Sequence, residues 1–109
     1  MLKVTATMGA DVALRDVVTH AERVESLGYD TLSVAEAVHD GMLSSMAALG
    51  ATTRLRVSQG VLVAFARSPM LAAQGAWDLQ AYSDGRFQLG LGTQVKGNII
   101  GRFSMPWSA

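Results

Sequence analysis

The chain has 109 residues, half of them hydrophobic, and its formal net charge is zero. The nine lysines and arginines are scattered from Lys3 to Arg102, so no basic stripe exists that could neutralise the phosphates of a nucleic acid. There is no cysteine, which excludes disulfides and thiolate metal sites and fits a reducing compartment. We therefore expect one small domain with a hydrophobic core and no nucleic-acid partner.

The sequence shows no targeting signal and no membrane span. Its first residues alternate between polar and apolar, unlike a secretory signal with a charged region followed by an apolar one. The most apolar stretch, residues 41–51, is too short to cross a bilayer and contains two serines. These features predict a soluble cytoplasmic protein with no membrane partner.

The first half of the chain predicts two strand–helix units. Residues 2–6 include β-branched side chains and predict a short strand. Between residues 13 and 27 the apolar side chains recur at the spacing of one helical face, and Gly28 stands where a helix often ends in a left-handed residue. Residues 31–35 predict a second strand, and residues 42–52 a helix of small and apolar residues.

The second half of the chain repeats this pattern. Residues 55–65 predict a third strand, nearly all apolar toward its end, as expected for a strand covered on both faces. Ser68 and Pro69 predict an N-cap followed by proline at the first position of a helix that reaches about Tyr82. Residues 86–91 predict a fourth strand.

Strands and helices that alternate at this spacing indicate right-handed βαβ units and a parallel sheet. Both a barrel and an open doubly wound sheet fit this α/β pattern. A (β/α)8 TIM barrel needs about 250 residues, and this chain supplies about four βα units before another helix could begin near residues 95–103. We therefore predict that residues 1–109 are the N-terminal half of a barrel, truncated after strand four, with Trp77 packed in its wall.

Ligand sites in parallel α/β folds gather beyond the carboxyl ends of the strands. Residues 35–40 follow the second predicted strand and place Glu36, His39 and Asp40 close together. Such groups can act as general acid or base, or hold a ring nitrogen of a cofactor. The alternative is a solvated loop in which Asp40 only caps the next helix. No second histidine or carboxylate cluster completes a ligand set nearby, so we expect no metal site.

Glycines mark two further candidate positions. Gly60 interrupts a buried strand, which indicates either a close ligand approach or a contact that excludes a side chain. Gly90 and Gly92 leave the fourth strand and would let backbone approach a flat ring or a phosphate. The following Gly97 does not have the spacing of a dinucleotide fingerprint.

Several segments resemble the luciferase-like monooxygenase superfamily. Residues 25–31 are similar to its pattern E-x-x-G-[YF]-D-[ST]. Residues 67–69 and 78–92 also resemble the superfamily, the latter through the pattern D-x-x-S-x-G-R-x-x-L-G-x-G, which residues 83–92 match from its serine onward. Residues 93–97 and 102–107 are most similar to a branch of deazaflavin-dependent oxidoreductases. The resemblance extends over essentially all 109 residues but only over the first half of the family's barrel.

This resemblance implies a (β/α)8 barrel that binds the deazaflavin coenzyme F-420, or alternatively FMN, at its C-terminal mouth. Deazaflavin members transfer hydride between the coenzyme and a small-molecule substrate. The family's third strand carries a non-prolyl cis peptide behind the ring, and Gly60 and Val61 occupy that position here. Thr93 and Gln94 match cofactor contacts after strand four.

The resemblance also assigns catalytic residues. Glu36 matches the family's acid at the end of strand two. Where deazaflavin members commonly place a histidine next, this chain has Ala37, and His39 lies two residues further on. The coenzyme's phosphate tail usually depends on later strands, so we expect these 109 residues alone to be inactive.

Three hypotheses follow. The first is an F-420-dependent oxidoreductase, present as its N-terminal half, and the second is an FMN-dependent monooxygenase that activates oxygen. The third is a non-catalytic half-barrel that pairs with another chain or a copy of itself. Four parallel strands would leave two open edges and an uncovered apolar interior face, which predicts a homo-oligomer or association through the barrel edges.

Overall fold

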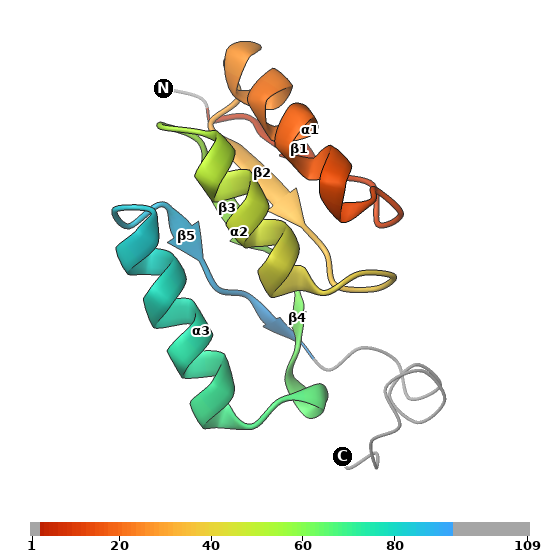
Figure 1. Cartoon of the computed structure of the whole chain (residues 1–109), viewed down its shortest axis with the longest axis vertical. Coiled ribbons are helices and arrows are strands. Elements are labelled where there is room, and N and C mark those ends of the chain that lie inside the picture. The colour runs from red at the N-terminus through yellow and green to blue at the C-terminus, as the bar shows by residue number, and fades with distance from the viewer. Residues whose placement is uncertain (1–2, 93–109) are drawn as a thin grey trace.

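The computed structural model describes residues 3–92, in which short strands alternate with helices (Figure 1). Along the chain the elements are β1 (Thr5–Thr7), α1 (Leu14–Ser26), β2 (Thr31–Val34), α2 (Gly41–Ala51), β3 (Arg56–Gln59), β4 (Leu62–Val63), the 3-10 helix η1 (Ala64–Ala66), α3 (Pro69–Tyr82), β5 (Phe87–Gln88) and β6 (Leu91–Gly92). No helix in this part of the chain is long and apolar enough to span a bilayer.

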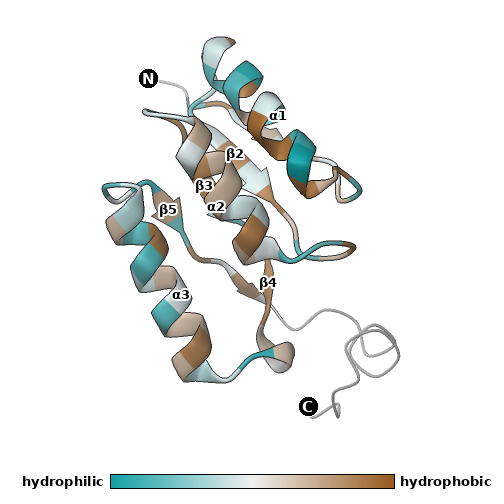
Figure 2. Cartoon of the chain, in the orientation of Figure 1, coloured by the Kyte–Doolittle hydropathy of each residue, from teal (hydrophilic) through white to brown (hydrophobic). Residues whose placement is uncertain are grey.

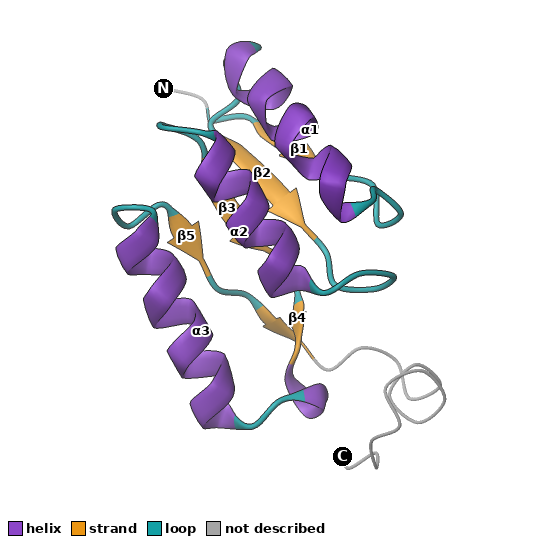
Figure 3. Cartoon of the chain, in the orientation of Figure 1, coloured by secondary structure: helices purple, strands orange, loops and turns teal. Residues whose placement is uncertain are grey.

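The strands form parallel pairs, and the three α-helices lie on one side of them (Figure 3). The main sheet has the order β1-β2-β3-β5, and β4 pairs with β6. α1 packs against α2, and α2 packs against α3. The predicted parallel α/β architecture is therefore confirmed.

The core lies between the sheet and the helices. Side chains alternate between the two faces of a strand, so residues adjacent in register share a face. Leu32, Val57 and Phe87 are adjacent in register, face the helices and are at most 2% exposed. Val17 of α1 and Leu49 of α2 complete this buried layer from the other side.

The opposite face of the sheet is polar, which corrects the expectation of an uncovered apolar interior. Thr7, Ser33, Ser58 and Gln88 are adjacent in register on this face and are half-buried or exposed. Hydroxyl and amide side chains keep their hydrogen bonds to water, so exposing them costs little. Most of the exposed large apolar side chains of the described residues lie on the helices, although Val61 and Leu91 in the strand layer are also exposed.

Two predicted strands are each divided in the structure. The predicted strand 55–65 separates at Gly60 into β3 and β4 and then enters η1. Similarly, the predicted strand 86–91 becomes β5 and β6, separated by two residues. The first strand begins at Thr5 rather than at residue 2 and extends through Thr7.

The predicted helix around residues 69–82 is present, but its buried side was assigned incorrectly. Ser68 caps α3 by accepting a hydrogen bond from the Leu71 N–H at 3.1 Å, and Pro69 is at its start, as predicted. Ala72 and Leu79 are the buried residues of α3. Trp77 is 75% exposed, so the prediction that it packs in the barrel wall is wrong for the described chain.

Charged side chains hold the turns at the amino ends of the strands. The Glu25 carboxylate accepts hydrogen bonds from the backbone N–H groups of Thr53, Arg54 and Leu55, at 3.1, 2.7 and 2.7 Å. Burial acts to raise the pKa of Glu25, but these hydrogen bonds outweigh it and leave the pKa below its ordinary value. Glu25 thereby fastens α1 to the turn before β3.

Arg86 closes the carboxyl end of α2. Its guanidinium donates to the backbone carbonyls of Leu49 and Thr52 at 3.0 Å each, and to that of Leu55 at 2.8 Å. It also donates to the Ser83 carbonyl at 2.9 Å. The last carbonyls of a helix lack partners within the helix, so Arg86 satisfies groups that would otherwise need water.

Candidate functional site

The candidate site lies where β2 and β4 end, and Glu36 is its most buried charged residue. Glu36 follows β2 and is 3% exposed. Its Oε2 accepts a hydrogen bond from the Gly41 N–H at 2.8 Å, at the start of α2. Its Oε1 accepts another from the Val63 N–H of β4 at 3.0 Å. One carboxylate therefore joins the ends of two strands and the beginning of a helix.

Arg67 is the ion-pair partner of Glu36. Arg67 follows η1, and its guanidinium donates to both carboxylate oxygens, with 2.7 Å between Nη2 and Oε2. The Arg67 side chain is 17% exposed, so this bidentate pair is shielded from much of the solvent. A second carboxylate, that of Asp40, accepts from Arg67 Nη2 at 3.3 Å.

These contacts set the charge of the cluster. Burial acts to raise the pKa of Glu36, but the hydrogen bonds from Arg67, Gly41 and Val63 outweigh it and hold the pKa below its ordinary value. The hydrogen bond to Glu36 raises the pKa of Arg67 in turn. Glu36 is therefore an anion at neutral pH whose two oxygens already accept hydrogen bonds, a state that suits positioning better than proton transfer.

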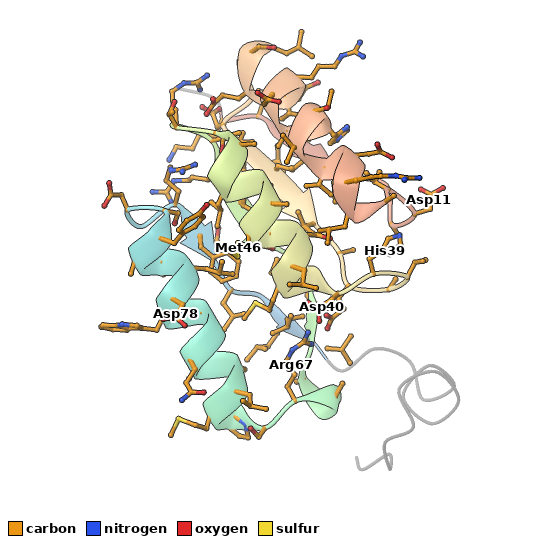
Figure 4. The ribbon with its side chains drawn as sticks, in the orientation of Figure 1. Asp11, His39, Asp40, Met46, Arg67 and Asp78 are labelled. Carbon is orange, nitrogen blue, oxygen red and sulfur yellow. The ribbon has the colours of Figure 1, made fainter. Side chains whose placement is uncertain are left out.

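Asp40 and His39 belong to the loop that carries Glu36. Asp40 caps α2 by accepting from the Met42 and Leu43 N–H groups at 2.9 and 3.1 Å, so the predicted capping role is present. An open cavity of about 420 Å³ is lined by residues 36–40 together with Ala66 and Arg67. In Figure 4 Asp40 and Arg67 approach each other, whereas His39 lies further toward the beginning of α1.

The peptide bond between Gly60 and Val61 is cis, at the position that the family resemblance indicates. Gly60 N–H donates to the Val34 carbonyl at 2.7 Å, and the Val61 carbonyl accepts from Glu36 N–H at 3.4 Å. These contacts connect the segment to the end of β2 and to the first residue of the cavity wall. Both Gly60 and Val61 are exposed in the described chain.

Glycines keep side chains out of the space beside this segment. A Cβ on Gly90 would lie 2.2 Å from the Gln59 carbonyl oxygen, and one on Gly92 would lie 2.4 Å from Val61 Cγ2. On Gly60 a Cβ would lie 3.2 Å from the Ser33 hydroxyl. The exposed surface here therefore includes the backbone of Gly60, which a flat ring system can approach closely, beside the exposed side chains of Val61 and Leu91.

The structure brings some of the predicted site residues together. Glu36 and His39 line the same cavity, and Gly60 and Val61 adjoin it through the Glu36 backbone. Thr93 and Gln94 lie outside the described residues. Arg67 was not predicted as a site residue, although a cation after the third strand could have been matched with an acid after the second.

Comparison with known proteins identifies the family. The sequence profile of the luciferase-like monooxygenase family matches residues 1–109. The chain belongs to this family. Among curated relatives of the chain, an uncharacterized protein of Mycobacterium tuberculosis and one of Mycobacterium bovis are each 49% identical over 87 residues. That match covers 80% of this chain but only 26% of each relative, so the chain spans about a quarter of their length.

Solved structures agree with this assignment at the level of the fold. The coenzyme F-420 dependent tetrahydromethanopterin reductase of Methanopyrus kandleri has a TM-score of 0.84 at 17% identity, covering 97% of this chain and 31% of that one. The oxygenating constituent of 3,6-diketocamphane monooxygenase from Pseudomonas putida, in complex with FMN, has a TM-score of 0.79 at 15% identity, covering 94% and 32%. The chain therefore has the fold of about a third of these TIM-barrel enzymes.

Proposed function

We propose that the complete protein to which these residues belong transfers hydride between coenzyme F-420 and a small organic substrate at the carboxyl ends of the strands. The observation that carries the proposal is the exposed Gly60–Val61 segment, which Glu36 N–H joins to the cavity beside the Glu36 and Arg67 ion pair. A coenzyme ring bound against that backbone would supply the hydride chemistry. We further propose a cytoplasmic location.

The described residues have distinct roles in this proposal. Gly60 and Val61 support the ring, and the ion pair of Glu36 with Arg67 fixes the loop that follows β2. His39 lines the cavity on that loop and is the candidate for moving a proton to or from the substrate. Thr93 and Gln94 remain predicted cofactor contacts.

An FMN-dependent monooxygenase is the second candidate, because a chain of this fold is solved in complex with FMN. The two candidates are separated by titrating the full-length protein with reduced F-420 and with reduced FMN under nitrogen. We expect binding of F-420 and no consumption of oxygen when air is admitted, since a deazaflavin hardly reacts with oxygen. Binding of FMN alone, with oxygen consumption, would overturn the F-420 proposal.

The role of His39 has its own test in the same protein. We expect His39→Gln to lower kcat about 100-fold and to leave the F-420 dissociation constant within about twofold, because general acid–base catalysis typically contributes at least that factor. Single-turnover kinetics at several pH values measure the effect. An unchanged kcat would remove His39 from the proposed mechanism and leave the coenzyme assignment standing.

A further inference from the structure

Gln59 is a fully buried amide immediately before the Gly60–Val61 segment. It is the last residue of β3 and is 0% exposed. It is in register with Val34, the last residue of β2, and both side chains lie on the face of the sheet that the helices cover. An amide removed from water destabilises a protein unless its N–H groups and its carbonyl find hydrogen-bond partners.

The Gln59 amide finds these partners in two different elements. Its Oε1 accepts a hydrogen bond from the Ser45 hydroxyl of α2 at 2.7 Å. Its Nε2 donates to the Val34 carbonyl of β2 at 3.0 Å. The same carbonyl accepts from the Gly60 N–H at 2.7 Å, so the side chain of Gln59 and the backbone of the next residue hold the end of β2 together.

The amide also packs against the backbone that holds the Glu36 carboxylate. A Cβ on Gly41 would lie 2.8 Å from the Gln59 Cδ, so glycine is needed at the start of α2 to leave room for the amide. The Gly41 N–H in turn donates to Glu36 Oε2 at 2.8 Å. Gln59 therefore connects the two parts of the candidate site, the Gly60–Val61 segment and the loop that carries Glu36.

The fold alone does not account for a polar pair at this position. The neighbouring layer of the core is apolar and is formed by Leu32, Val57 and Phe87. α2 carries no charged residue, and it lacks the strongly hydrophilic segments that are visible on α1 and α3 (Figure 2). Replacing both partners of a buried hydrogen bond by apolar groups of similar shape is often nearly neutral for stability. The pair of Gln59 and Ser45 instead adds direction, because a fully satisfied polar network fixes one arrangement of the elements that it joins.

We propose that Gln59 is a positioning residue that keeps the Gly60–Val61 backbone in register with the Glu36 loop, so that a bound coenzyme ring meets both. This role rests on the proposed function, since the ring is the ligand that the segment would support. Gln59 itself does not touch the ring, because its side chain is buried on the helix side of the sheet. Small displacements of supporting groups weaken a site, so loss of the Gln59 amide should weaken ring binding even where the fold is intact.

A double variant of the full-length protein separates positioning from packing. Gln59→Met with Ser45→Ala replaces the hydrogen-bonded pair by apolar side chains of similar shape. The control, Thr52→Val, removes a buried hydroxyl at the opposite end of α2. We expect both proteins to unfold cooperatively in urea, the double variant to bind F-420 about tenfold more weakly than the wild type, and the control to bind within about twofold of it. The visible circular dichroism of bound F-420 should change in the double variant only.

A parallel titration with FMN separates a failure of this role from a failure of the proposed function. If the wild type binds FMN instead of F-420, the F-420 proposal fails, whereas a loss of FMN affinity of about tenfold in the double variant still supports the role of Gln59. A folded double variant that binds the ring as tightly as the wild type does, or a wild type that binds neither coenzyme, would overturn the positioning role.

A pair of glycine substitutions decides the matter if the double variant fails to fold. Gly41→Ala pushes a Cβ into the Gln59 amide. Gly50→Ala, on the same helix but away from the site, places a Cβ 2.5 Å from the Tyr82 hydroxyl oxygen and is the matched control. We expect Gly41→Ala to weaken F-420 binding about fivefold or more and Gly50→Ala to change it less than about twofold. Equal affinities in the two folded variants would contradict the role of Gln59.

Discussion

The two ends of the strands use the same residue types differently. At the amino ends, Glu25 and Arg86 bind mainly backbone groups and secure the turns and the end of α2. At the carboxyl ends, Glu36 and Arg67 bind each other and border an open cavity. The charged residues at the strand ends therefore fall into two groups. Glu25 and Arg86 stabilise the fold, whereas Glu36 and Arg67 form part of the candidate site. Substitutions at the two ends should separate stability from coenzyme binding.

The largest effect on stability is expected from Arg86→Met. This change removes the hydrogen bonds to all four backbone carbonyls that the guanidinium contacts, and leaves these part-buried acceptors with fewer partners. We expect a loss of about 3 kcal/mol in the free energy of unfolding, measured by urea titration. Arg15→Met, at an exposed arginine of α1, is the control and should cost less than about 0.5 kcal/mol. Equal losses in the two variants would contradict the assigned role of Arg86.

Glu36→Gln should reduce stability less than Arg86→Met does, and it should weaken coenzyme binding more. The amide keeps the side-chain volume but leaves the Arg67 cation, which is 17% exposed, without its closest counter-ion. We expect a loss of about 2 kcal/mol, below the range for fully buried pairs because solvent reaches part of the guanidinium. A variant as stable as the wild type would show that the ion pair is dispensable.

The smallest effect is expected from Glu25→Gln, and it depends on pH. The folded-state pKa of Glu25 is lowered, so its contribution is present above the unfolded pKa of about 4.3 and is lost as pH falls through the folded value. We expect a loss of about 1 kcal/mol at pH 7, since the carboxylate lies near the surface. The difference between variant and wild type should shrink below about pH 4 in urea titrations. A difference that persists at low pH would contradict the role of the charge.

The helices could be predicted from the sequence because their signals are local. The predicted helix 13–27 corresponds to α1 at Leu14–Ser26, Gly28 has a φ of 89°, and Ser68 caps α3. Apolar spacing and capping residues determine such elements within a few turns. Helix α2 shows the limit of this reasoning, because its small and apolar composition did not distinguish its buried side from its exposed side.

The site was less predictable because it depends on contacts between distant segments. Arg67 is 31 residues from Glu36, and their pairing requires the ends of β2 and β4 to meet. The division of the predicted strand 55–65 was also missed, since the segment gives no local sign of a break except Gly60. The polar face of the sheet was overlooked for a similar reason: its threonines and serines become one surface only in register.

The most direct test of this account is a fluorescence titration of coenzyme F-420 into the full-length wild type, Glu36→Gln and Glu25→Gln at pH 7. We predict that the wild type binds and that Glu36→Gln loses affinity about tenfold or more, which corresponds to about 1.4 kcal/mol. Glu25→Gln should stay within about twofold of the wild type. No binding by a folded wild type, or equal losses in the two variants, would contradict the division between the two ends of the strands.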